Sequence, residues 1–194
     1  MTKTEFENFK KDVLSRLENG LPDYLHYHCL NHTKRVLEKA EIIAKAENVS
    51  ADDLLLIKIA ALYHDYGFLS TYQNHETEGC KAVQQELKHQ LSQDEIDAVC
   101  GMIKATEIPQ TPKNLHEKIL ADADLEYIGT DEFTEIAHKL YLELKSKNPD
   151  LSIDQWNKIQ IDFIGKHHFF TDYAKTHLSS KKHKNLLELK KMVL

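Results

Sequence analysis

Apolar residues recur every three or four positions along most of the chain, a spacing that predicts amphipathic helices. Gly67 allows a turn, after which residues 68–74 form a loop, and Pro109 and Pro112 exclude helix from residues 108–112. No convincing pair of strands is present, so we expect an all-α fold. The predicted helices cover residues 3–18, 28–47, 51–63, 75–90, 92–105, 114–128, 131–145, 152–168 and 171 to the C-terminus.

The segment Leu54–Tyr63 is apolar on nearly every side and is interrupted only by Lys58. This pattern predicts the central buried helix of the fold. The segment is also far shorter than the roughly 20 residues that a membrane span requires. Capping-box patterns mark the start of this helix and of two others, at Ser50-x-x-Asp53, Ser92-x-x-Glu95 and Ser152-x-x-Gln155.

The composition is ordinary for a single globular domain, with 194 residues of which 41% are hydrophobic and 29% are charged. A net charge of −6 argues against a nucleic-acid partner. The three cysteines form no CxxC motif, and the polar first residues lack the apolar stretch of a signal peptide. We therefore expect reduced thiols, a cytoplasmic location and no membrane partner.

The buried central helix ends in the tetrapeptide His64-Asp65-Tyr66-Gly67. An imidazole and a carboxylate in such a position are costly unless they are paired. The helix dipole also disfavours Asp65 at a C-terminus, so a cation must compensate for it. Because adjacent helical residues point roughly 100° apart, both side chains reach one ion only where the backbone turns. The tetrapeptide therefore predicts half of a metal site.

Two further candidate ligands lie on inward helical faces. His32 shares its line with Val36 and residues further along the same helix. Asp124 has only apolar or aromatic neighbours at helical spacing, whereas Asp122 has charged ones, including Lys118. Asp124 is therefore the better ligand, and Asp122 is a candidate for orienting a histidine or a water. Two imidazoles and two carboxylates form a mixed ligand set for a divalent metal, better suited to Mn, Fe, Co, Ni or Zn than to Mg alone.

Taken together, these segments resemble the HD-domain superfamily of metal-dependent phosphohydrolases, and in particular stand-alone bacterial members. The resemblance spans about residues 24–130 and leaves residues of about 131–194 as a C-terminal helical extension within one domain, 1–194. It implies a helical bundle in which His32, His64, Asp65 and Asp124 bind a divalent metal. The motifs that carry it are Tyr27-His28-x-x-x-His32, Ala60-Ala61-Leu62-Tyr63-His64-Asp65-Tyr66-Gly67, His75-Glu76 and Ile119-Leu-Ala-Asp-Ala-Asp124.

Two departures from common versions of the family stand out. Many members with two metals carry a histidine near the end of the helix that matches residues 92–105, but here the stretch reads Met102-Ile-Lys-Ala-Thr106. A full second metal site is therefore not expected. Phe68 follows Gly67, where many members have a polar residue.

The function that these features predict is hydrolysis of a phosphoester, most simply of a nucleotide, by metal-activated water. The expected partner is thus a small phosphorylated molecule. Asp65 is expected to contribute to catalysis as a ligand of the metal. His75 and Glu76 are candidates for orienting the water or protonating the leaving group. Arg35 and Lys104 are candidate cations for holding the phosphate.

Two other hypotheses stay open at this stage. The first is an oxygenase with two irons on an HD-like fold, which needs additional histidines. The second is a regulatory helical module with a structural metal, although such sites are usually closed and often contain cysteine. The metal, the substrate and the oligomeric state, including a homodimer, are left open by the sequence.

Overall fold

The structure, a computed structural model, describes residues 1–193, and for Lys3 only the backbone. Leu194, at the end of the last predicted helix, lies outside the described residues. Within them the chain forms helices and no strand, which confirms the all-α prediction. The α-helices are α1 (Lys3–Gly20), α2 (Leu30–Ala46), α3 (Ala51–Tyr63), α4 (His75–Leu87), α5 (Gln93–Lys104), α6 (Leu115–Asp124), α7 (Phe133–Lys147), α8 (Ile153–Lys166) and α9 (Asp172–Lys191).

Short 3-10 helices occupy two places where the prediction differs. The first, η1 (Tyr66–Leu69), covers the start of the expected loop, and the second, η2 (Glu126–Gly129), separates the end of the expected helix 114–128 from α6. Two of the predicted capping boxes form in full, at the starts of α5 and α8. At α3, the Ser50 hydroxyl accepts from the Asp53 backbone N–H, but the Asp53 carboxylate accepts from that hydroxyl at 2.7 Å rather than from the Ser50 backbone.

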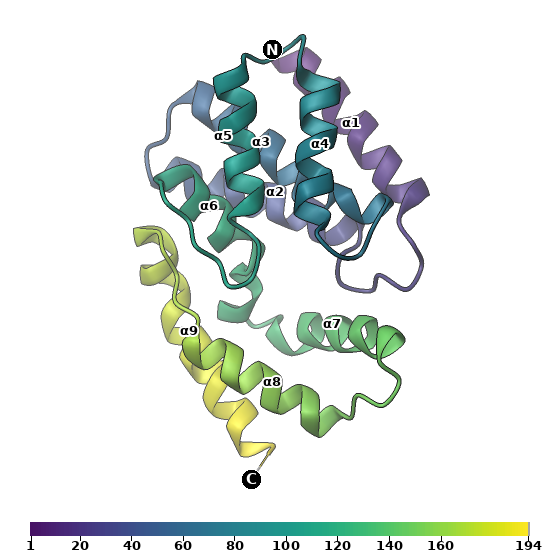
Figure 1. Cartoon of the computed structure of the whole chain (residues 1–194). Helices are drawn as coiled ribbons and strands as arrows, with labels where there is room; N and C mark the ends of the chain where they lie inside the picture. The colour runs from purple at the N-terminus through teal and green to yellow at the C-terminus, as the bar shows by residue number, and fades with distance from the viewer. Residues whose placement is uncertain (194) are drawn as a thin grey trace.

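The helix α3 is the centre of the first half of the molecule. It packs against α1, α2, α4, α5 and α6, and these helices form one bundle in the upper part of Figure 1. The side chains of Ile57 and of residues 59–62 are fully buried. Each large aliphatic side chain among them stabilises the fold by about 1.5–3 kcal/mol through burial. No helix in the described part of the chain combines the length and apolarity needed to cross a membrane.

The helices α7, α8 and α9 lie below this bundle in Figure 1. Their apolar core also includes Tyr27, from the segment before α2, and Tyr127 and Ile128 from η2. The side-chain amide of Asn185, on α9, donates to the backbone oxygens of Ile128 and Thr130 at 3.1 and 2.9 Å. The C-terminal helices are therefore bound to the bundle through η2 and through the segment before α2.

Gly67 is required for a reason that differs from the prediction. No glycine within the described residues has a positive φ, so backbone freedom is not what the turn needs. A Cβ atom at Gly67 would instead collide with the backbone of His75, lying 2.7 Å from its carbonyl carbon. The absence of a side chain allows η1 to contact the first turn of α4, and this contact positions His75 beside Asp65.

Candidate metal centre

Side chains from three helices converge at one point beneath the end of α3. The ring atom Nε2 of His32, on α2, lies 3.2 Å from Nε2 of His64 and 3.0 Å from Oδ1 of Asp124, at the end of α6. His64 Nε2 lies 3.7 Å from the same Asp124 oxygen. The ligand atoms of these three residues all lie within 4.8 Å of one another, so the group could hold a metal ion.

Asp65 adjoins this group through the two imidazoles. Its Oδ2 lies 3.4 Å from His32 Nε2 and 3.3 Å from His64 Nε2. This oxygen is buried and has no hydrogen-bond partner. A buried carboxylate oxygen without a donor is costly, so an ion bound between these atoms would satisfy it.

The protonation of His64 also suits a metal ligand. Its Nδ1 lies 2.8 Å from the carbonyl oxygen of Ala61, which can only accept, so Nδ1 carries a proton. A neutral His64 therefore presents a lone pair at Nε2, facing Nε2 of His32. A backbone carbonyl that fixes the tautomer in this way is a common second partner of metal-ligating histidines. The residues present thus fit a divalent cation.

The two carboxylates of Asp65 and Asp124 favour positive charge at this site. Burial alone would lower the pKa of His64, but Asp65 and Asp124 outweigh burial and raise the pKa of His64 to about 9. Burial would likewise raise the pKa of Asp65, yet the charges of His64 and His28 hold the pKa of Asp65 well below its usual range. Two carboxylates therefore attract either protons or a dication to the same place, and a dication neutralises both of them.

The first turn of α4 adds two more side chains to the edge of the group. His75 Nε2 lies 3.5 Å from Asp65 Oδ1 and 3.4 Å from Glu76 Oε1. Burial lowers the pKa of His75 despite these carboxylates. The ring of Phe68 stacks on His75, with centroids 3.9 Å apart, and on His28, with centroids 4.5 Å apart. Phe68 thus packs on both histidines, whose own centroids lie 6.1 Å apart, and this gives the departure from a polar residue at this position a structural role.

Glu143 is a site residue that sequence reasoning missed. It lies on α7, is fully buried, and accepts from the backbone N–H groups of Tyr27 and His28, both at 3.0 Å. Its other oxygen accepts from His28 Nδ1 at 2.5 Å and from the Tyr72 hydroxyl at 3.2 Å. No local signal marks Glu143, because its partners are more than 70 residues away in the sequence.

The pair of Glu143 and His28 affects stability in a pH-dependent way. Burial opposes ionisation of Glu143, but its bonds with His28 outweigh burial and lower the pKa of Glu143. A lowered carboxyl pKa stabilises the fold above the unfolded pKa, and that contribution is lost as pH falls through the folded pKa. Burial would lower the pKa of His28, but Asp65 and Glu143 raise it. The His28 contribution is therefore full below about pH 6.5 and is lost as pH rises through the raised value.

We expect Glu143→Gln to lower the free energy of unfolding by about 2–3 kcal/mol at pH 6, because an amide replaces a charged acceptor in four hydrogen bonds. Urea unfolding at several pH values measures this. The difference from the unmodified protein should narrow as pH falls below about 4.5, where Glu143 of the unfolded chain is protonated, and should vanish once pH passes the lower pKa of Glu143 in the folded protein. Glu135→Gln, on the exposed face of the same helix, removes an ion pair with Lys139; it is the control and should change stability by less than about 0.5 kcal/mol. Equal effects of the two variants would contradict the assignment.

The structure does not bring the two candidate phosphate-binding cations to the metal centre. The guanidinium of Arg35 instead binds Glu126 at 2.7 Å and Glu132 at 2.6 Å, and joins α2 to η2 and to the start of α7. Lys104 is exposed at the end of α5 and does not line the cavity described below.

Asp122 also differs from its prediction as a group that orients a histidine or a water. It is fully buried, and its carboxylate accepts from the backbone N–H groups of Phe170 and Thr171, at 2.9 and 2.7 Å, and from the Thr171 hydroxyl at 2.7 Å. These donors lie at the start of α9. The charged neighbours of Asp122 in sequence suggested a solvated position, but the segment between α8 and α9 supplies its hydrogen-bond donors and the carboxylate is buried.

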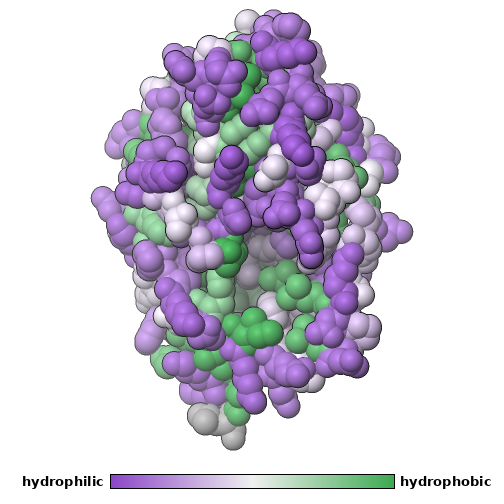
Figure 2. All heavy atoms as spheres, in the orientation of Figure 1, coloured by the Kyte–Doolittle hydropathy of each residue, from purple (hydrophilic) through white to green (hydrophobic). Residues whose placement is uncertain are grey.

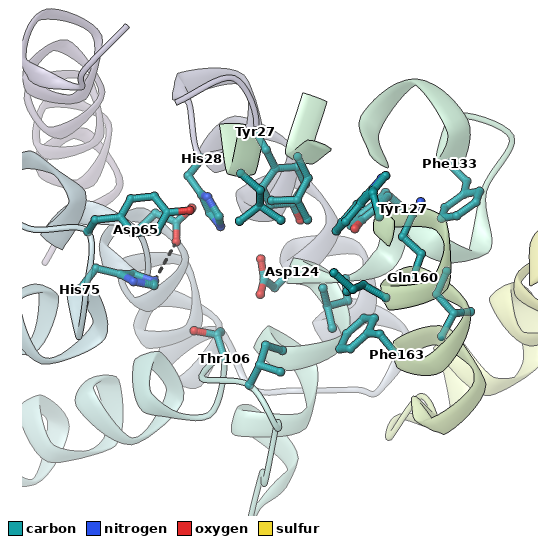
Figure 3. A pocket seen from close by; sticks show the side chains of 18 of the residues that line it. Tyr27, His28, Asp65, His75, Thr106, Asp124, Tyr127, Phe133, Gln160 and Phe163 are labelled. Atoms are coloured by element: carbon teal, nitrogen blue, oxygen red, sulfur yellow. Dashed lines mark ion pairs between the residues drawn. The ribbon is translucent and has the colours of Figure 1, made fainter. Parts of the chain in front are cut away.

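A cavity of about 420 Å³ opens beside the metal centre, between the bundle and the C-terminal helices. In the view of Figure 2 the surface is hollowed at this level and apolar side chains gather around the hollow. Figure 3 shows Asp65, His75 and His28 on one side of the cavity, Asp124 near its centre, and aromatic side chains on the other side. Asp65, His75, Glu76 and Asp124 all line it, so the two predicted carboxylate ligands and the predicted catalytic residues face one cavity.

Comparisons with known proteins agree with this architecture. The chain is similar to the crystal structure of a predicted HD superfamily hydrolase from an uncultured Thermotogales bacterium, with a TM-score of 0.65 and 22% sequence identity. The match covers 100% of this chain and 98% of that one. No curated protein matches the chain. The family model described as HD domain matches residues 29–126, half of the chain. The chain therefore belongs to the HD-domain family.

Proposed function

We propose that this protein is a metal-dependent hydrolase that cleaves phosphoesters. The observation that carries the proposal is that the group of candidate ligands opens onto a cavity through Asp65 and Asp124. A structural metal site is usually closed by its ligands, whereas a catalytic site keeps access to substrate. The similar Thermotogales structure is described as that of a predicted hydrolase, which supports hydrolysis as the class of reaction.

In this proposal His32, His64, Asp65 and Asp124 hold the ion. When bound, a divalent ion lowers the pKa of a water ligand and polarises a phosphoryl oxygen. The two carboxylates of the set balance the double charge of the ion. They also lie beside both imidazoles, because an oxygen of each carboxylate is within 3.4 Å of His32 Nε2 and within 3.7 Å of His64 Nε2.

His75 and Glu76 are proposed to transfer protons during the reaction. His75 faces the cavity, and its lowered pKa keeps the ring neutral at pH 7, able to accept a proton at Nε2. Asp65 Oδ1 and Glu76 Oε1 lie 3.5 and 3.4 Å from this nitrogen and stabilise the ring once it is charged. The pair can then return the proton to the leaving oxygen of the ester.

Elemental analysis of the purified protein, followed by a screen of phosphoesters, tests the proposal. We expect at least one divalent metal per chain, and hydrolysis that disappears with EDTA and returns when the same metal is added. The screen includes nucleoside mono-, di- and triphosphates, since a nucleotide is the substrate that the sequence suggests. A metal-free protein as isolated that binds no divalent ion, or a metal-loaded protein that cleaves no phosphoester, would overturn the proposal.

A further inference from the structure

The cavity beside the metal centre lacks the side chains that recognise several phosphates. Among the described residues that line it there is no lysine and no arginine. Proteins that bind di- or triphosphates usually surround the additional charges with such cations. Positive charge in this cavity is therefore confined to the metal centre, which fits a substrate with a single phosphate there. Lys158 and Lys166 line the second cavity described below.

The wall opposite the metal centre is strongly apolar. It is formed by α7 and α8, which contribute Leu140, Leu144, Trp156, Ile159 and Phe163, here called the apolar wall. Figure 3 shows Phe163 on the side of the cavity away from Asp65 and His75. Burial of a hydrocarbon or aryl group against such a surface is favourable in proportion to the area removed from water.

A second cavity, of about 560 Å³, adjoins the first, and the two share Ile108, Leu125, Ile159 and Phe163. Ile108 and Ile159, where the cavities meet, are 53% and 50% exposed. These two side chains face water in the free protein and would be covered by an apolar group that continues outward. The space therefore admits a body longer than the first cavity alone.

Three polar side chains that line the first cavity away from the metal centre already donate to other groups of the protein. The Thr106 hydroxyl donates to the carbonyl of Ile103 at 2.8 Å, and the Tyr72 hydroxyl donates to Glu143. The side-chain nitrogen of Gln160 donates to Asn157 at 3.3 Å. Within the first cavity, the ribose hydroxyls and base edge of a nucleotide would find few free donors, and burying them unpaired is unfavourable. Unpartnered polar atoms of Gln110 and His167 belong instead to residues that line the second cavity.

We propose that the substrate is a phosphate monoester of an apolar alcohol or phenol, with its phosphate at the metal centre and its apolar body against the apolar wall. This inference rests on the proposed function and names its substrate class. In the reaction, a water oxygen forms a bond to phosphorus while the bond from phosphorus to the ester oxygen breaks. The ester oxygen takes up a proton, so the products are the free alcohol and inorganic phosphate.

Binding can be measured without turnover, because the single tryptophan of the chain, Trp156, belongs to the apolar wall. The Mn²⁺-loaded protein is titrated with butyl-, hexyl- and octylphosphonate, which cannot be hydrolysed at an ester bond, while tryptophan fluorescence is recorded. We expect Kd to fall on the order of tenfold for each two methylenes added. A Kd that does not change with chain length, or tighter binding of adenosine monophosphate than of octylphosphonate, would overturn the substrate class.

A pair of matched variants locates the apolar body. Ile159→Ala removes an exposed aliphatic side chain from the apolar wall, and Leu187→Ala removes one of similar exposure, 45%, from α9 outside the cavities described here. We expect Ile159→Ala to raise KM for octyl phosphate about fivefold with kcat unchanged and to leave methyl phosphate unaffected. Leu187→Ala should change neither. Equal effects of the two variants would contradict the placement of the apolar body.

The two proposals fail in distinguishable ways. If nucleoside monophosphates are cleaved better than octyl phosphate and phosphonate binding ignores chain length, the apolar substrate class is wrong and phosphoester hydrolysis stands. If no phosphoester is cleaved while phosphonate binding strengthens with chain length, the proposed reaction is wrong and the apolar class of ligand stands.

Discussion

Asp65→Asn should lower both the metal affinity and the rate of phosphoester hydrolysis by at least a hundredfold. The substitution keeps the shape of the side chain but removes the negative charge that faces both imidazoles within 3.4 Å. Partners that merely orient metal ligands cost ten- to a hundredfold when they are mutated, so a proposed ligand should cost at least as much. Elemental analysis and the rate on the best substrate measure the two effects.

A thermal readout separates lost metal from lost folding. A ligand that binds only the folded state raises its stability, so Mn²⁺ should raise the Tm of the unmodified protein. The Tm of Asp65→Asn should respond far less to Mn²⁺. The control is Asp97→Asn, which alters an exposed carboxylate on α5 that accepts from Gln93. An Asp65→Asn protein that retains its metal and full activity would remove Asp65 from the site.

Gly67→Ala should destabilise the fold by about 3 kcal/mol or more, although it adds a single methyl group. The new Cβ would lie 2.7 Å from the backbone carbonyl carbon of His75, and backbone cannot rotate aside as a side chain can. Either η1 or the first turn of α4 must move, and both movements separate Asp65 from His75. Hydrolysis should therefore fall in whatever fraction of the protein still folds.

Gly165→Ala is the matched control for this prediction. Gly165 lies in the last turn of α8, and a Cβ there would meet nothing within 4 Å. Because alanine is a better helix former than glycine, and the last turn shows only part of that difference, Gly165→Ala should leave the free energy of unfolding unchanged or raise it by up to about 0.5 kcal/mol. Urea unfolding of both variants measures these changes in the free energy of unfolding. Similar behaviour of the two would mean that close packing at Gly67 is not what the turn requires.

Three of the candidate metal ligands could be singled out because burial made them conspicuous in the sequence. His64 and Asp65 end an apolar helix, and Asp124 has only apolar neighbours at helical spacing. Each polar group in such surroundings needs a partner, and the predicted ligands serve as partners for one another. The structure brings His32, His64 and Asp124 together, with Asp65 beside the imidazoles, as that reasoning requires.

The candidates outside this group could not be sorted by the same reasoning. Arg35 stands one turn from His32, but its direction is decided by Glu126 and Glu132, which are about 90 or more residues away in the sequence. Asp122 has charged neighbours on its own helix, yet it is fully buried and its carboxylate is bound by Phe170 and Thr171, just before α9. Both outcomes depend on which helix covers which face, and spacing within one helix carries no information about that.

The helices themselves were predictable to within a few residues, and the cavity was not. Periodicity and capping patterns depend on residues close in sequence, as the starts of α5 and α8 show. The apolar wall, in contrast, consists of α7 and α8 residues that would be expected to fill an ordinary core. Only the arrangement of these helices below the bundle leaves space between them and the metal centre.

The bonds of Asp122 and Glu143 bear on how such a chain could be recombined with its relatives. A chain ending near residue 130 would leave Asp122 without Phe170 and Thr171, and the N–H groups of Tyr27 and His28 without their acceptor. Exchanging the last three helices for those of another protein would create the same deficits unless equivalent donors and acceptors came with them. The two halves are therefore expected to be inherited as a unit, and grafting one onto a foreign partner would require at least these contacts to be rebuilt.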